Sequence, residues 1–124
     1  TMWYIGGAYF NHPDHRAAAQ AAVDAISLSA RNRPSFPELL AEGLEPHEVK
    51  EVYLSDSAQP NVWVDITDTM ELKIDALKEH KSQVLDGEGR LEQMIRGWAQ
   101  EVAKGQDMEY AEGFKRFQLG IWEG

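Results

Sequence analysis

The proline at position 13 constrains the fold of this chain more than any other single residue. It stands between an apolar run, residues 2–10, and an alanine-rich run, residues 16–26. Proline suits the first turn of a helix, because the N–H that it lacks would have no partner there. The sequence therefore predicts a short strand that is followed by a helix beginning close to Pro13.

The residues around this proline concentrate the chain's chemistry. Two imidazoles and a carboxylate fall within four positions, at His12, Asp14 and His15. Side chains three residues apart share a helix face, so His12 and His15 are expected to lie together at the start of this helix. The partial positive charge of a helix N-terminus also favours anions there.

The residues alone leave two interpretations of this cluster open. In the functional one, it binds a metal or transfers protons, and Asp14 orients a histidine as carboxylates beside ligating histidines usually do. In the structural one, Asp14 caps the helix and both histidines are ordinary surface residues, a frequent outcome for short motifs.

The composition of the chain argues against several classes of protein. The chain has 124 residues, a formal net charge of −9 and no cysteine. We expect one domain, residues 1–124, with a modest core. The acidic balance argues against nucleic-acid and anionic-membrane partners, and any metal must be held by His, Asp or Glu. No transmembrane segment or signal peptide is recognisable, so a cytoplasmic protein is expected.

Periodicity predicts the elements of the remaining chain. After a long connection over residues 29–49 with one short helical piece at 36–40, strands are expected at 51–54 and 62–66, as possible neighbours. A helix is expected from Asp68 to about Val84, opening with a capping box that Asp68 forms with Glu71. A second helix, Arg90–Lys104, is expected to end at Gly105 and to be buried along Leu91, Met94, Ile95, Trp98 and Val102. In the last segment, Tyr110, Phe114 and Phe117 repeat at helical spacing.

Several segments, taken in order, resemble one family. They are His12–Arg16 before the alanine-rich helix, Pro37–Leu40, Val62–Asp68, the residues Lys73, Ala76, Leu77, His80, Ser82 and Gln83, and Glu109–Phe114. This set, over about residues 8–119, resembles the C-terminal half of the LmbE-like or PIG-L-like zinc-dependent N-deacetylases. The resemblance implies a partial Rossmann-like α/β fold with two to three strands and three to four helices, whose N-terminal half is missing. It also implies hydrolysis of N-acetyl groups on amino sugars or related small amides.

The resemblance implies a role for each residue of the cluster. His15 matches the third zinc ligand, His12 the residue that stabilises the oxyanion, and Asp14 the carboxylate that orients His12. The family's other two zinc ligands and its general base belong to a His-Pro-Asp-Asp motif that this chain lacks, since its one His-Pro-Asp is followed by His15. Zinc is thus possible, with an incomplete site in one chain. His47 and His80 are expected to have structural roles, and no role is assigned to Lys73.

Three hypotheses follow. The first is a partial N-deacetylase that is not catalytically competent alone, so that the chain need not be an enzyme by itself. The second is a working zinc deacetylase whose ligands are completed by a second copy or by a complementary N-terminal chain. The third is a non-catalytic oligomeric binding module. Without the N-terminal half, part of the apolar core surface would stay open, and such surfaces mark association. We therefore expect a homo-oligomer or a complementary N-terminal chain as partner, and a small-molecule amide as substrate if the protein is active.

Overall fold

The computed structural model describes residues 4–5, 9–55, 58–82 and 89–120. The chain divides into two compact units. Unit 1 comprises residues 1–58 and 115–124, and unit 2 comprises residues 59–114. The prediction of one domain stays a prediction, and each unit is described by itself.

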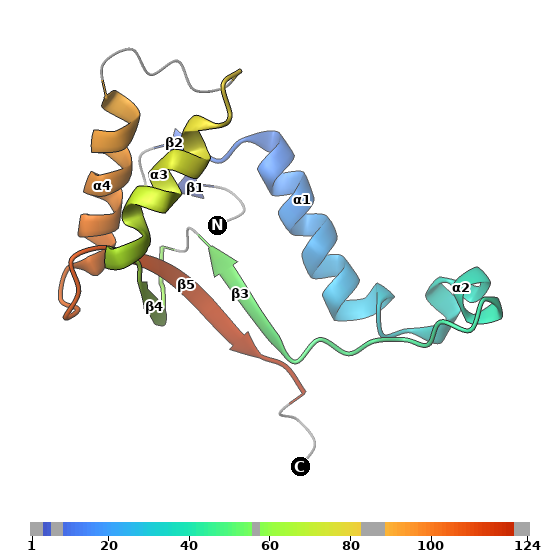
Figure 1. The fold of residues 1–124 in the computed structure, drawn as a ribbon. Helices are drawn as coiled ribbons and strands as arrows, with labels where there is room; N and C mark the ends of the chain where they lie inside the picture. Colours follow the sequence, from blue (N-terminus) through green and yellow to red (C-terminus); the bar gives the residue numbers. More distant parts are fainter. Residues whose placement is uncertain (1–3, 6–8, 56–57, 83–88, 121–124) are drawn as a thin grey trace. The chain divides into compact units, whose positions relative to one another are not determined.

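Unit 1 is built around one long helix (Figure 1). Two short strands, β1 (Tyr4–Ile5) and β2 (Tyr9–Phe10), pair antiparallel before it. Helix α1 (Pro13–Asp24) begins at the predicted proline and continues as a π-helical turn, Ala25–Ser29. A 3₁₀ turn (Arg33–Ser35), helix α2 (Pro37–Ala41) and strand β3 (Glu51–Ser55) follow, in good agreement with the predicted ranges.

Unit 2 places two helices beside a strand pair. Strand β4 (Val62–Asp65) leads through a 3₁₀ turn (Thr67–Thr69) into helix α3 (Met70–Lys78). Helix α4 (Arg90–Ala103) lies against α3. Strand β5 (Ala111–Gln118) begins in this unit and pairs antiparallel with β4, with Trp63 opposite Gly113. A Cβ atom at Gly113 would lie 3.2 Å from side-chain atoms of Pro60 and Val102, which explains the glycine at this position.

The sheet corrects two predictions. Its strand order is β3-β5-β4, so the two strands predicted as neighbours are separated by β5. The last segment, predicted to be helical from Tyr110, Phe114 and Phe117, is strand β5. Helical spacing of apolar residues is a weak guide in a short segment, because pairing with a neighbouring strand can override it.

The start of α3 also differs from its prediction. The N-cap residue is Thr69, and no side-chain cap hydrogen bond is recorded there, so Asp68 does not form a capping box. The carboxylate that organises this turn is Asp65, which accepts hydrogen bonds from the backbone N–H of Thr67 (2.9 Å) and from its hydroxyl (2.6 Å). These bonds lower the pKa of Asp65 below its ordinary value of 3.8.

The hydrophobic core lies in unit 2. Among the described residues, every buried apolar side chain belongs to it: Ile66, Met70, Ile74, Ala99, Ala103 and Ala111. The predicted stripe of α3 is confirmed at Met70 and Ile74, each 1% exposed. That of α4 is only partly right, because the helix buries its alanines and leaves Met94 and Trp98 exposed. Gly105, with a φ of 79°, follows the end of α4 as predicted.

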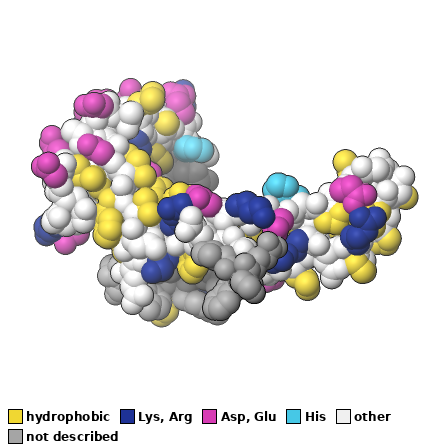
Figure 2. All heavy atoms as spheres, turned by 90° about the horizontal axis from the view of Figure 1, so that it is seen from below, with side chains coloured by type: hydrophobic (Ala, Val, Ile, Leu, Met, Phe, Trp, Pro, Cys, Tyr) yellow, Lys and Arg dark blue, Asp and Glu magenta, His cyan; other side chains and the backbone are white. Residues whose placement is uncertain are grey.

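Unit 1 has a different character. Asn11 is the one buried residue among those of unit 1 that the structure describes, and α1 has no buried residue. Large apolar side chains such as Leu28 and Leu44 are more than half exposed. Figure 2 shows hydrophobic side chains reaching the surface in many places on the face that it presents. No helix of the described residues is long and apolar enough to cross a membrane.

An ion-pair network connects helices α3 and α4 at the surface of unit 2. Arg96 donates to Glu92 (2.9 Å) and Glu71 (2.5 Å), and its guanidinium lies 5.9 Å from the centre of the Tyr110 ring. Hydrogen bonds from Arg96 and then Lys78 lower the pKa of Glu92 below its ordinary value of 4.5.

This network predicts acid sensitivity. Because the pKa of Glu92 is lower in the folded protein, its contribution to stability is fully present above pH 4.5 and is lost as the pH falls through the lowered value. We expect the urea concentration at the midpoint of unfolding to decrease as the pH is lowered below 4.5. In the Glu92→Gln variant this concentration should decrease less steeply with pH. Glu38→Gln on α2 is the control and should keep the parent's slope. Identical slopes for all three proteins would contradict the prediction.

Candidate functional site

The start of helix α1 is organised by His12 rather than by Asp14. His12 is the N-cap residue and Pro13 occupies the first turn. The Nδ1 atom of His12 accepts a hydrogen bond from the backbone N–H of Asp14 at 3.2 Å. The structural interpretation of the sequence had assigned the cap to Asp14, and in this respect it is wrong. Capping by a side-chain acceptor satisfies one of the amide donors that a helix leaves open at its start.

The structure brings the two histidines together as their spacing predicts. The ring centres of His12 and His15 lie 5.7 Å apart, with 53° between the ring planes. The carboxylate of Asp14 has an oxygen 3.7 Å from Nδ1 of His12. The side chains of His12 and Asp14 are 61% and 87% exposed, so this end of α1 is open to an incoming molecule.

These contacts define how His12 carries its proton. When Nδ1 accepts from the Asp14 N–H, a neutral imidazole must hold its proton on Nε2. When the ring is an imidazolium, Nε2 again carries a proton, and the Asp14 carboxylate faces Nδ1. In the neutral tautomer that this hydrogen bond selects, Nε2 carries the proton and can donate to an oxygen atom. The role of His15 as a metal ligand, which the resemblance implies, stays a prediction.

The donor set does not amount to a zinc site within the described residues. A catalytic zinc ion usually takes three protein ligands and a water molecule. No group of three His, Asp or Glu residues that could hold a metal occurs in the part of the chain that the structure describes. The described residues therefore do not assemble a complete zinc site, and the expectation that zinc binds an incomplete site in one chain stays a prediction.

The other residues left without a role lie elsewhere. His47, in the loop before β3, is exposed, and its backbone N–H donates to the carbonyl of Ala30 at 2.8 Å. His80 follows α3 and is exposed as well. Lys73 forms a half-buried ion pair of 2.6 Å with Glu112, which links α3 to β5 within unit 2. Sequence reasoning missed this pair, because the two residues are 39 positions apart and no local pattern joins them.

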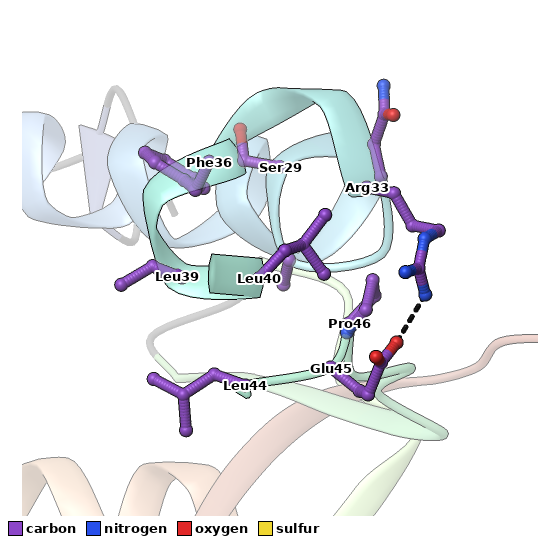
Figure 3. Close-up of a pocket in the computed structure, with 10 residues that line it drawn as sticks. Ser29, Arg33, Phe36, Leu39, Leu40, Leu44, Glu45 and Pro46 are labelled. Atoms are coloured by element: carbon purple, nitrogen blue, oxygen red, sulfur yellow. Dashed lines mark hydrogen bonds and ion pairs between the residues drawn. The ribbon is translucent and has the colours of Figure 1, made fainter. Parts of the chain in front are cut away.

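A small apolar pocket lies beside α2 (Figure 3). Phe36, Leu39, Leu40 and Leu44 line it, and an ion pair between Arg33 and Glu45 closes one side. Its volume is about 90 Å³. Sites for small molecules usually measure about 300–1,000 Å³, so this pocket is too small to be the substrate site.

Comparison with known proteins shows what this part of a fold is similar to. The chain is homologous, over part of their length, to diacetylchitobiose deacetylases. It is 36% identical over 115 residues to the diacetylchitobiose deacetylase of Thermococcus kodakarensis. This match covers 92% of this chain and 42% of that protein. No family model matches the chain.

A solved structure gives the same result. The chain is similar to N,N′-diacetylchitobiose deacetylase from Pyrococcus horikoshii, complexed with its inhibitor MPG, with a TM-score of 0.80 and 32% sequence identity. The match covers 90% of this chain and 42% of that one. The chain thus spans less than half the length of these relatives. The predicted partial α/β deacetylase fold is confirmed, whereas the roles of His12, Asp14 and His15 stay predictions.

Proposed function

We propose that this chain is one portion of a zinc-dependent N-deacetylase that removes acetyl groups from amino sugars or related small amides. The observation that carries the proposal is the match of 92% of this chain to only 42% of a diacetylchitobiose deacetylase. The start of α1 supports it, because two imidazoles and a carboxylate gather there.

Each residue of the cluster has a role in this proposal. His15 is the one zinc ligand that the chain contributes, and the remaining ligands come from another polypeptide portion. His12 donates a hydrogen bond from Nε2 to the amide oxygen as negative charge develops on it, a type of contact that stabilises transition states strongly. Asp14 is a positioning residue, since its backbone N–H and its carboxylate both face Nδ1 of His12.

The test compares the chain alone with a chimera. The chimera joins this chain to the portion of the Thermococcus kodakarensis enzyme that lies outside the match, and both proteins are assayed with zinc for acetate release from N,N′-diacetylchitobiose. We expect release by the chimera and none above background by the chain alone. An inactive, folded chimera would contradict the proposal, as would full activity of the chain alone as a monomer.

The same assay separates the alternatives. Activity of the chain alone that rises with its concentration, together with a dimer in light scattering, would support completion of the site by a second copy. A folded, inactive oligomer that binds no zinc in calorimetry would support the non-catalytic module.

A further inference from the structure

Phe10 is the last residue of strand β2 and stands two positions before His12. Its side chain is 80% exposed, the highest value among the large apolar side chains in the part of the chain that the structure describes. Single exposed apolar residues are common on protein surfaces and need no explanation by themselves. What distinguishes Phe10 is its position, because β2 leads directly into α1 and the histidine cluster (Figure 1).

The backbone places Phe10 and His12 on the same side of this segment. Exposure alternates over three successive residues: Phe10 is exposed, Asn11 is buried, and the side chain of His12 is 61% exposed. Alternation of this kind is typical of extended backbone, in which every second side chain points to the same face. The Cα atoms of Phe10 and His12 are then about 7 Å apart, at about 3.3 Å per residue. An exposed phenyl ring thus borders the imidazole at the start of α1.

The surroundings of Phe10 combine this apolar ring with a few polar groups. The ring centre of His15 lies 5.7 Å from that of His12, and a carboxylate oxygen of Asp14 lies 3.7 Å from Nδ1 of His12. An apolar surface beside a small number of placed polar groups is the usual composition of a site for a small molecule. The segment 10–15 therefore offers one surface for an apolar face of a ligand and another for its polar atoms.

An N-acetylated amino sugar has both of these parts. Its acetamido group is polar, and the faces of its pyranose ring carry C–H bonds with a partial positive charge. The face of an aromatic ring carries partial negative charge, so the two kinds of ring attract one another face to face. The amide nitrogen is bonded directly to a ring carbon, so the sugar ring begins two bonds from the carbonyl carbon.

We propose that Phe10 is a specificity-determining residue whose ring packs against the sugar ring of the substrate while Nε2 of His12 faces the acetamido oxygen. The inference rests on the proposed function, which places that oxygen at His12. It narrows the substrate class to amides carried on a sugar ring, because a small open-chain amide has no face to set against the phenyl ring.

The test uses the chimera with zinc and N,N′-diacetylchitobiose. Phe10→Ala removes the ring, Phe10→Leu keeps an apolar side chain without a π face, and Phe10→Tyr keeps the aromatic face. Phe36→Ala is the matched control, since Phe36 is a second exposed phenylalanine of unit 1, at 45%, and lies beside α2. For each protein, kcat and KM are measured, together with the inhibition constant of acetohydroxamate, a zinc chelator with an acetyl group and no sugar ring.

The expected result is a loss of sugar binding only. Phe10→Ala and Phe10→Leu should raise KM about tenfold and leave kcat within about twofold, because a contact made equally in the bound substrate and in the transition state affects binding alone. Phe10→Tyr and Phe36→Ala should keep KM within about twofold of the parent. The inhibition constant of acetohydroxamate should be the same in every variant.

Three outcomes would overturn the proposal. The first is an unchanged KM in Phe10→Ala. The second is a KM that Phe10→Leu restores to the parent's value, since any apolar side chain would then suffice. The third is an acetohydroxamate inhibition constant that rises together with KM, since the loss would then not depend on the sugar ring. Circular dichroism checks the fold of each variant, and Phe10→Leu carries the comparison with Phe10→Tyr if Phe10→Ala does not fold.

Failure of the proposed function is recognised separately. If a folded chimera releases no acetate, calorimetry measures Kd for N,N′-diacetylchitobiose in place of KM. A Kd about tenfold weaker in Phe10→Ala and unchanged in Phe10→Tyr would support the sugar contact without the reaction, whereas equal affinities or no binding would overturn it. An active chimera whose KM does not depend on Phe10 would leave the proposed function standing and remove the role of Phe10.

Discussion

In the chimera described above, His12→Ala should lower kcat by about 10²–10³-fold, the usual cost of removing one donor to a developing oxyanion. The reason lies in the geometry of the α1 start. Nδ1 of His12 accepts a hydrogen bond from the backbone N–H of Asp14, so the neutral ring that makes this bond carries its proton on Nε2. Its loss removes a donor that acts mainly in the transition state, so KM should change little.

The other histidines provide matched controls. His47→Ala and His80→Ala remove exposed imidazoles outside the α1 cluster and should leave kcat within about twofold of the parent. Initial rates of acetate release at saturating substrate measure the effect. Equal losses in all three variants would show a general effect on folding, and an unchanged kcat for His12→Ala would remove His12 from the reaction.

The second large effect concerns stability. Met70→Ala should lower the free energy of unfolding by about 2–5 kcal/mol, the usual cost of truncating a large buried side chain to alanine. Met70 is 1% exposed and packs in one cluster with Ile66, Ile74 and Ala99. Removing its side chain leaves a cavity in the core of unit 2, because the surrounding residues relax only in part.

Leu72→Ala is the control for this substitution. Leu72 lies on the same helix and is 70% exposed, so its loss should change the free energy of unfolding by no more than about 0.5 kcal/mol. Urea titrations followed by tryptophan fluorescence measure both variants. Equal midpoints for Met70→Ala and Leu72→Ala would show that the α3 face assigned to the core is wrong.

Local rules predicted those parts of the molecule that depend on neighbouring residues. Pro13 set the start of α1, Gly105 lies just beyond the end of α4, and the spacing of His12 and His15 brought their rings together. These features follow from the preferred dihedral angles of single residues and from the period of a helix. For the same reason, the pattern at Met70 and Ile74 identified the buried face of α3.

Prediction was weaker where an element depends on its partners. Tyr110, Phe114 and Phe117 repeat at helical spacing, but residues 111–118 form strand β5, in which Ala111–Phe114 pair with β4. In α4 the alanines face the core while Trp98 is exposed. A stripe of apolar residues does not show which of its edges meets the neighbouring element.

The order of residues therefore determined the starts of α1 and α4 and the residues gathered at the head of α1. Each of these depends on residue type and on spacing along one stretch of chain. Only the tertiary structure decided the strand order β3-β5-β4 and the confinement of the described hydrophobic core to unit 2. These features require contacts between residues far apart in the chain, and no local pattern contains that information.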